Sequence, residues 1–140
     1  MIVIADESKY VDTLGKFHLP VEVVKFGWKT TAQNIVELLE DSDVAATGVE
    51  LRKTGLSPFV SDEGHYILDC YCEQINDPSR LSVRLNLIPG VVENGLFIGL
   101  ADTVILGRKD GTVQVLDRDD GNGEFEPLNL PIDLEFDEES

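Results

Sequence analysis

The most informative stretch of the chain is residues 76–98, which have the sequence NDPSRLSVRLNLIPGVVENGLFI. Asn76-Asp77-Pro78-Ser79 is typical of a helix start, because proline is favoured in the first helical turn. Pro89-Gly90 is a strong stop signal, and three apolar residues before it share one helical face: Leu81, Leu85 and Ile88. Residues 91–98 are rich in β-branched and aromatic side chains, so they predict a strand that follows the helix directly.

The residues before this stretch predict the other elements of the same domain. Pro20 marks the entry to an alternating segment, and Thr30 or Thr31 stands where a helix cap is expected. The turn signal Asp62-Glu63-Gly64 predicts a hairpin. The upstream elements are a strand over residues 21–26, a helix over 28–39, and strands over 49–52 and 66–72. The full order is strand, helix, strand, strand, helix, strand, which predicts an α+β fold with a split βαβ (ferredoxin-like) small domain over residues 20–99.

Other segments do not belong to that plan. Met1–Ala5 is a continuous apolar run, typical of a fully buried strand in a parallel sheet. Residues 103–107 and 112–116 flank Asp110-Gly111 and predict a second hairpin. We expect these strands to form part of another sheet. The predicted organisation is a terminal strand and loop over residues 1–19, the small domain over 20–99, a returning hairpin over 100–116, and an acidic mobile tail over 117–140.

The composition argues against several classes of protein. The 140 residues are 42% hydrophobic, as in ordinary globular domains, and no apolar run reaches the roughly 20 residues that span a bilayer. The formal net charge of −16 repels phosphate backbones, so we expect no nucleic-acid partner and no membrane partner. Cys70 and Cys72 are the two cysteines, and no export signal precedes them. We therefore expect a cytoplasmic protein without a disulfide framework.

Several runs of residues match one known family in order and spacing. They are Ile4 to Phe17, Leu19 to Val23, Ser61-Asp62-Glu63-Gly64 before Ile67-Leu68-Asp69, Ile88 to Phe97, and Ala101-Asp102. In these runs the chain resembles the middle and later part of type A ribose-5-phosphate isomerase, from Ile2 to about Leu116.

The resemblance implies an aldose–ketose isomerase of the non-oxidative pentose phosphate pathway that needs no metal or other cofactor. A carboxylate moves a proton between C1 and C2 of the sugar phosphate through an enediolate, and cationic and hydroxyl groups hold the phosphate and the developing oxyanion. The family joins a Rossmann-like α/β domain to the split βαβ domain and forms homo-oligomers. Its phosphate loop and catalytic glutamate precede the part that this chain matches. The Rossmann-like domain is thus expected to be largely missing, and the resemblance assigns no catalytic residue here.

One site residue carries over from the family. Lys9 matches the substrate-contacting lysine at the end of the Asp-x-Ser-Lys stretch, and we expect it to bind the sugar phosphate if the other half of the enzyme is supplied. A loop after the carboxyl end of a parallel strand is where α/β proteins bind ligands. Asp6 and Ser8 are expected to shape this turn. We expect no turnover by the chain alone; turnover would mean that another acid, Glu7 or Asp12, replaces the base.

Other titratable residues have no predicted role, and no metal site is expected. His18 and His65 stand in no ligand pattern, and the spacing of the two cysteines suits neither a redox nor a zinc motif. The acidic run from Asp117 to Glu124 lacks the spacing of a calcium loop. The alternative function is an oligomerisation or small-ligand-binding module over residues 20–99, in which case residues 1–8 and 102–116 would fray or pair differently.

Overall fold

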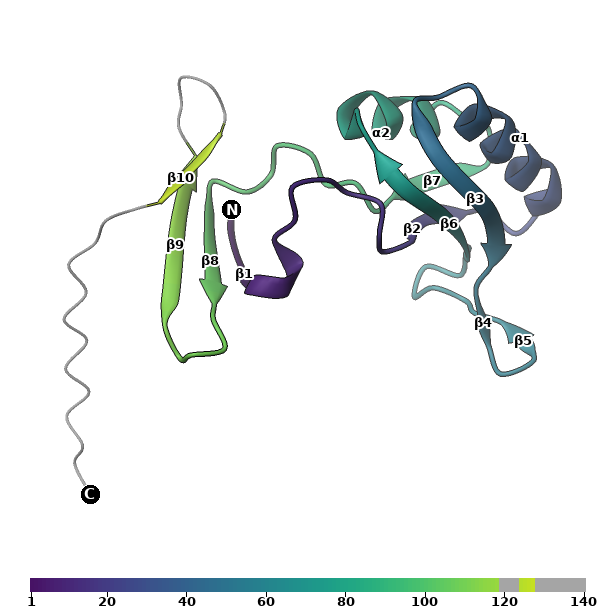
Figure 1. Cartoon of the computed structure of the whole chain (residues 1–140). Helices are drawn as coiled ribbons and strands as arrows, with labels where there is room; N and C mark the ends of the chain where they lie inside the picture. Colours follow the sequence, from purple (N-terminus) through teal and green to yellow (C-terminus); the bar gives the residue numbers. More distant parts are fainter. Residues whose placement is uncertain (119–123, 128–140) are drawn as a thin grey trace. The chain divides into compact units, whose positions relative to one another are not determined.

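A computed structural model describes residues 1–118 and 124–127. The chain divides into two compact units (Figure 1). One is Val11–Ile98, and the other combines Met1–Tyr10 with the described part of Gly99–Ser140. Each unit is described by itself. In the described ranges, no helix is long and apolar enough to cross a membrane.

The unit Val11–Ile98 is a four-stranded sheet with two helices on one face (Figure 1). The strand order is β3-β6-β2-β7, and every neighbouring pair is antiparallel. The elements are β2 (Leu19–Val23), α1 (Trp28–Glu40), β3 (Val44–Leu51), β6 (Tyr66–Ile75), α2 (Pro78–Asn86) and β7 (Val91–Asn94). The helices and strands therefore follow one another in the predicted order, in a mixed α/β architecture.

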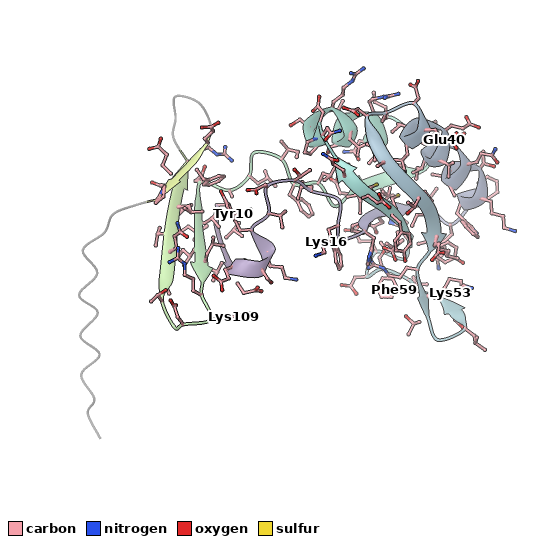
Figure 2. The ribbon with its side chains drawn as sticks, in the orientation of Figure 1. Tyr10, Lys16, Glu40, Lys53, Phe59 and Lys109 are labelled. Atoms are coloured by element: carbon pink, nitrogen blue, oxygen red, sulfur yellow. The ribbon has the colours of Figure 1, made fainter. Side chains whose placement is uncertain are left out.

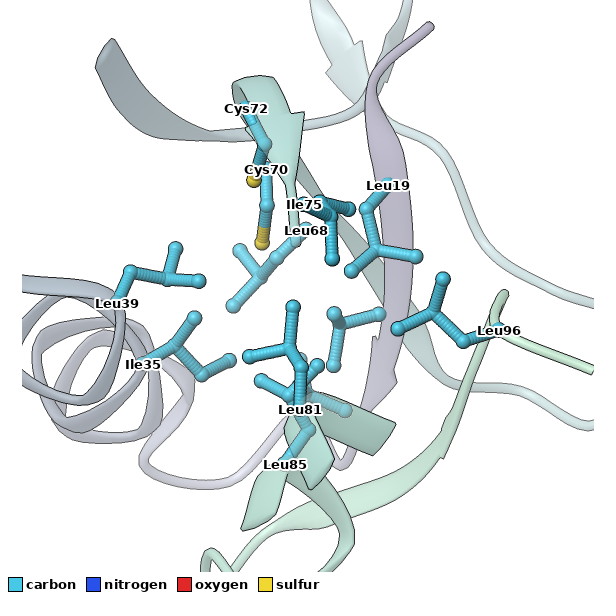
Figure 3. Packing of buried hydrophobic residues seen from close by; sticks show 12 residues of the cluster. Leu19, Ile35, Leu39, Leu68, Cys70, Cys72, Ile75, Leu81, Leu85 and Leu96 are labelled. Carbon is cyan, nitrogen blue, oxygen red and sulfur yellow. The ribbon is translucent and has the colours of Figure 1, made fainter. Parts of the chain in front are cut away.

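The core lies between the helices and the covered face of the sheet. Figure 3 shows Ile35 and Leu39 of α1 and Leu81 and Leu85 of α2 pointing into the same cluster. The sheet contributes alternate residues: Leu19, Val21 and Val23 of β2, and Leu68, Cys70 and Cys72 of β6. Alternation leaves the residues between them, such as Asp69 and Glu22, on the opposite face. Burying one such aliphatic side chain contributes roughly 1.5–3 kcal/mol, so this cluster dominates the stability of the unit.

A short hairpin extends the connection between β3 and β6. Strands β4 (Lys53–Thr54) and β5 (Ser57–Pro58) pair around Gly55 and Leu56, and the side chain of Leu56 is fully exposed. The Phe59 N–H donates to the carbonyl of Arg52 at 2.8 Å, which closes the base of the hairpin. The predicted turn at 62–64 follows, closed by a single bridge between Val60 and Tyr66.

Two local predictions were wrong. The helix cap is Gly27, with φ of +68°, and neither threonine caps the helix through its side chain. Thr31 lies inside α1, where its hydroxyl donates to the carbonyls of Gly27 and Pro89 at 3.4 Å each. The last strand stops at Asn94 instead of residue 98. The Asn94 side chain accepts from the Leu96 N–H at 3.0 Å, and this Asx-type turn ends the strand.

The second unit is a sheet in the order β1-β8-β9-β10. Strand β1 (Ile2–Asp6) is parallel to β8 (Thr103–Gly107), which forms the predicted hairpin with β9 (Val113–Arg118). A short helix, η1 (Glu7–Lys9), follows β1. The expected full burial of β1 is wrong for this structure, because Ile2 and Ile4 are 65% and 76% exposed. One face of β1 carries no covering layer in the described residues.

The expected mobile tail also needs correction. Asp117 and Arg118 continue β9, and β10 (Phe125–Pro127) pairs antiparallel with it. On its other side β9 is tied to β8 at this end, since the Thr103 hydroxyl donates to the Asp117 carboxylate at 2.6 Å. Strand pairing on both sides of β9 therefore orders these residues despite their acidic composition. The other predicted tail residues, 119–123 and 128–140, lie outside the described residues.

Candidate functional site

Lys9 lies at the carboxyl end of the parallel strand β1, in the last position of η1. The side chain is exposed. Its ammonium group makes no hydrogen bond or ion pair with any residue that the structure describes, so it is available to an anion. Open sheets of parallel strands bind ligands at this edge, because the loops after the strands converge there.

The turn that carries Lys9 is held by Asp6 and Ser8. The Asp6 carboxylate accepts from the Ser8 N–H at 3.0 Å and from the Ser8 hydroxyl. These bonds from Ser8, together with the nearby charge of Lys9, hold the pKa of Asp6 below its usual value of 3.8. The Tyr10 N–H then donates to the Glu7 carbonyl at 3.2 Å and ends the helix. The structure places Asp6 and Ser8 as the turn-forming residues that their sequence positions indicate.

The loop after β8 lies at the same edge of the sheet. Asp6 stands in register with Gly107, so β1 and β8 end side by side. The Lys109 N–H lies 3.4 Å from Glu7 Oε1, which joins the two loops. Figure 2 shows Lys109 at the turn between β8 and β9, in the same unit as Tyr10. The edge therefore carries two lysines, Lys9 and Lys109, and Arg108 beside them, although the chain as a whole is strongly acidic.

Asp6, Glu7 and Asp110 on the same two loops balance these three cations, so the edge offers cationic side chains to a small anionic ligand without a net positive charge. The resemblance to the family singled out Lys9, and nothing in the sequence indicated Lys109. Lys109 reaches this edge because β1 pairs in parallel with β8. That pairing joins segments about 100 residues apart, so local sequence patterns do not reveal it.

Comparisons with known proteins identify the family of the chain. The family described as Ribose 5-phosphate isomerase A (phosphoriboisomerase A) matches residues 1–111 of the chain. The chain belongs to this family. A similar protein, named Ribose-5-phosphate isomerase A, from Jannaschia sp. (strain CCS1) is 50% identical over 130 residues, which is 93% of this chain and 50% of that protein. The chain thus spans about half the length of the curated relatives it matches.

Solved structures of the same family resemble the fold. Ribose 5-phosphate isomerase from Plasmodium falciparum has a TM-score of 0.75 and 30% identity, covering 83% of this chain and 49% of that one. A D-ribose-5-phosphate isomerase in complex with phospho-erythronic acid has a TM-score of 0.70 and 38% identity, covering 84% and 49%. The resemblance predicted from the residues is confirmed.

The remaining candidates lie in the unit Val11–Ile98. His18 stacks on Phe17 with ring centroids 4.2 Å apart, and its Nε2 atom lies 3.5 Å from the Asp69 carboxylate. Cys70 and Cys72 are buried free thiols on the core face. Burial raises the pKa of Cys70 to about 12 and raises that of Cys72, so neither is a nucleophile at neutral pH. Most of the run from Asp117 to Glu124 lies outside the described residues.

The structure also brings together residues that the sequence does not connect. Glu22, Glu63 and His65 meet beside the turn at 62–64, with ligand atoms within 4.8 Å of one another. The strand register of β2 against β6 produces this meeting, and no spacing in the sequence indicates it. His65 was expected to have no role, but its Nδ1 atom lies 3.0 Å from Glu22 Oε1.

Proposed function

We propose that the chain takes part in the interconversion of ribose 5-phosphate and ribulose 5-phosphate. The observation that carries the proposal is the family match over residues 1–111 together with the unpaired ammonium of Lys9 at the carboxyl end of β1. A neighbouring structure that binds phospho-erythronic acid, a phosphorylated sugar acid, supports this class of ligand.

Lys9 supplies positive charge to this reaction. The substrate carries a phosphate, and the enediolate intermediate carries a second negative charge that grows as the proton leaves C2. An ammonium beside either group stabilises the transition state, and it does so best where its own position is already fixed. The Asp6–Ser8 turn fixes the backbone of Lys9 in this way. The base that moves the proton is the part of the family's machinery that we place outside this chain.

A chimera tests the proposal. The upstream half of the Jannaschia relative is fused to this chain at the start of the matched region, and the isomerisation of ribose 5-phosphate is measured. We expect activity in the chimera and none in the chain alone. Lys9→Ala should lower kcat/KM by about 100-fold, the usual effect of removing one group that stabilises an oxyanion.

The control is Lys53→Ala, which removes an exposed lysine from the β4–β5 hairpin (Figure 2). It should leave kcat/KM unchanged. A folded chimera without isomerase activity would contradict the proposed function. Equal activity of the Lys9→Ala and parent chimeras would contradict the role of Lys9 while leaving the reaction in place.

We also propose a finer description of the fold. Residues 20–99 form a split βαβ (ferredoxin-like) domain, supported by the strand order β3-β6-β2-β7 and its antiparallel pairings. Met1–Tyr10 and residues 100–116 belong to the Rossmann-like domain, supported by the exposed apolar face of β1 and by the half-length match to relatives. Residues 11–19, expected to belong with them, lie instead in the unit Val11–Ile98, where Leu19 is part of the core. The acidic tail would then begin beyond the strands of this sheet.

Partners and location are part of the same proposal. We propose a homo-oligomer that binds sugar phosphate and no nucleic acid; the net charge of −16 supports the second point. The free thiols of Cys70 and Cys72 support a reducing, cytoplasmic environment. Light scattering at several concentrations tests the oligomer, and a monomer at every concentration would contradict it.

A further inference from the structure

Three side chains with metal-binding atoms meet at one place in the unit Val11–Ile98. Glu22 comes from β2, Glu63 from the turn after residue 61, and His65 from the residue before β6. One ligand atom from each lies within 4.8 Å of the other two. We propose that these residues bind a Zn²⁺ ion, with water completing the coordination, and that the ion ties the turn to β2.

The distances fit this proposal. His65 Nδ1 and Glu22 Oε1 are 3.0 Å apart. Two ligands at 2.0–2.2 Å from a tetrahedral zinc ion stand about 3.4 Å apart, so this pair needs only a small displacement to admit the metal. Glu63 is exposed on the turn, and its nearest ligand atom lies within 4.8 Å of those of Glu22 and His65.

Ser61 holds Glu22 and His65, the two partly buried ligands, in place. The Ser61 hydroxyl donates to Glu22 Oε1 at 2.7 Å and accepts from the His65 N–H at 3.1 Å. The Ser61 N–H also donates to the His65 carbonyl at 2.8 Å. Such outer hydrogen bonds orient ligating carboxylates and imidazoles before the metal arrives.

The turn itself is compact, which keeps Glu63 near the other two ligands. Gly64 has a φ of +86°, the conformation that glycine adopts most readily, and its N–H donates to the Ser61 carbonyl at 2.9 Å. Glu63 therefore lies within a closed four-residue turn whose first residue contacts Glu22.

The surrounding charge favours a cation. Glu93 stands directly opposite Glu22 on the neighbouring strand, and Asp62 is in the same turn. In the part of the chain that the structure describes, no lysine or arginine forms an ion pair with Glu22 or Glu63. An ion of charge +2 would offset this local excess of carboxylates.

The ligand types distinguish zinc from the harder cations. Ca²⁺ and Mg²⁺ prefer six or more oxygen ligands, whereas one imidazole nitrogen with two carboxylates is a set that zinc accepts. We therefore expect Mg²⁺ to compete poorly for this site, even when it is in large excess.

The test is a calorimetric titration of the full chain with Zn²⁺, in physiological salt and excess Mg²⁺ to suppress diffuse binding to other acidic residues. We expect one ion per chain, a rise in Tm, and a change in the ¹⁵N shift of His65 Nδ1. Glu63→Gln and His65→Asn should each weaken binding at least about 10- to 100-fold, since that much is lost even when only an outer hydrogen-bond partner of a ligand is removed.

Matched controls use residues outside the cluster. Glu40→Gln, at the end of α1 (Figure 2), and His18→Asn should bind zinc as tightly as the parent chain. Glu63 is exposed, so its variant tests the site without disturbing the core. Undiminished binding in both Glu63→Gln and His65→Asn, or no binding of Zn²⁺ by the parent chain, would overturn the proposal. Neither result bears on the isomerase function.

Discussion

Arg52 and Asp69 form a two-point ion pair on the face of the sheet that the helices leave uncovered. Arg52 Nε donates to Asp69 Oδ2 at 3.0 Å, and a terminal guanidinium nitrogen donates to Oδ1 at 2.6 Å. Asp69 is 7% exposed, and its hydrogen bond to Arg52 raises the pKa of the guanidinium. The arrangement matches the planar fork that arginine presents to carboxylates.

Removing the arginine should destabilise this unit. Arg52→Met keeps much of the side-chain volume but leaves Asp69 without its principal donor, which costs about 1–3 kcal/mol for a buried polar group. Urea unfolding followed by circular dichroism measures the loss. Arg80→Met, which removes an exposed arginine of α2 that forms no ion pair with any residue the structure describes, is the control and should change stability little. Equal stability of the two variants would show that the pair contributes nothing.

The turn before Lys9 should titrate at unusually low pH. Because Ser8 lowers the pKa of Asp6, the carboxyl ¹³C signal of Asp6 should move with a midpoint below 3.8. Ser8→Ala should raise that midpoint toward 3.8, since the hydroxyl donor is lost. A folded-state pKa below the unfolded one means that the contribution of Asp6 to stability is present above 3.8 and is lost as pH falls through the lower value. An unchanged midpoint in Ser8→Ala would contradict the role of this hydroxyl.

The two thiols should be unreactive in the folded chain. Burial raises the pKa of Cys70 from 9.0 to about 12, so a thiol reagent near neutral pH should modify neither cysteine until urea unfolds the chain. A folded pKa above the unfolded one stabilises the fold below pH 9.0, and this contribution is lost as pH rises from 9.0 toward 12. Stability should therefore fall across that range, and less steeply in Cys70→Ala. Rapid labelling of the native chain would contradict the burial.

Local sequence patterns predicted the helices and strands well where the intrinsic propensity of the residues agrees with their packing in the fold. Helix α2 begins at Pro78 and has Asp77 as its cap, as the sequence indicates, and Asp110-Gly111 does turn between β8 and β9. Prediction failed where a distant contact decides the outcome. Gly27 replaces a threonine cap because Thr31 instead reaches the carbonyl of Pro89, which follows α2. Asn94 is a different case, because a local bond from the Leu96 N–H to its side chain ends the strand while the apolar residues around it favour a longer one.

The candidate site was predicted in part for the same reason. Lys9 ends a run of residues that matches the family, so the sequence alone could nominate it as a candidate. Lys109 reaches the same edge only because β1 pairs in parallel with β8. The group of Glu22, Glu63 and His65 arises from the pairing of β2 with β6, and contacts of that kind cannot be derived from spacing along the chain.

The β4–β5 hairpin has a practical consequence. The pairing of β4 with β5 and the hydrogen bond between Phe59 and Arg52 close the hairpin without any contact from its tip. Gly55 and Leu56 at the tip contribute nothing to the buried cluster. A loop of this kind accepts added residues at small entropic cost. An epitope or a fluorescent label inserted between Gly55 and Leu56 would thus report on the molecule in living cells while leaving the folding of its neighbours intact.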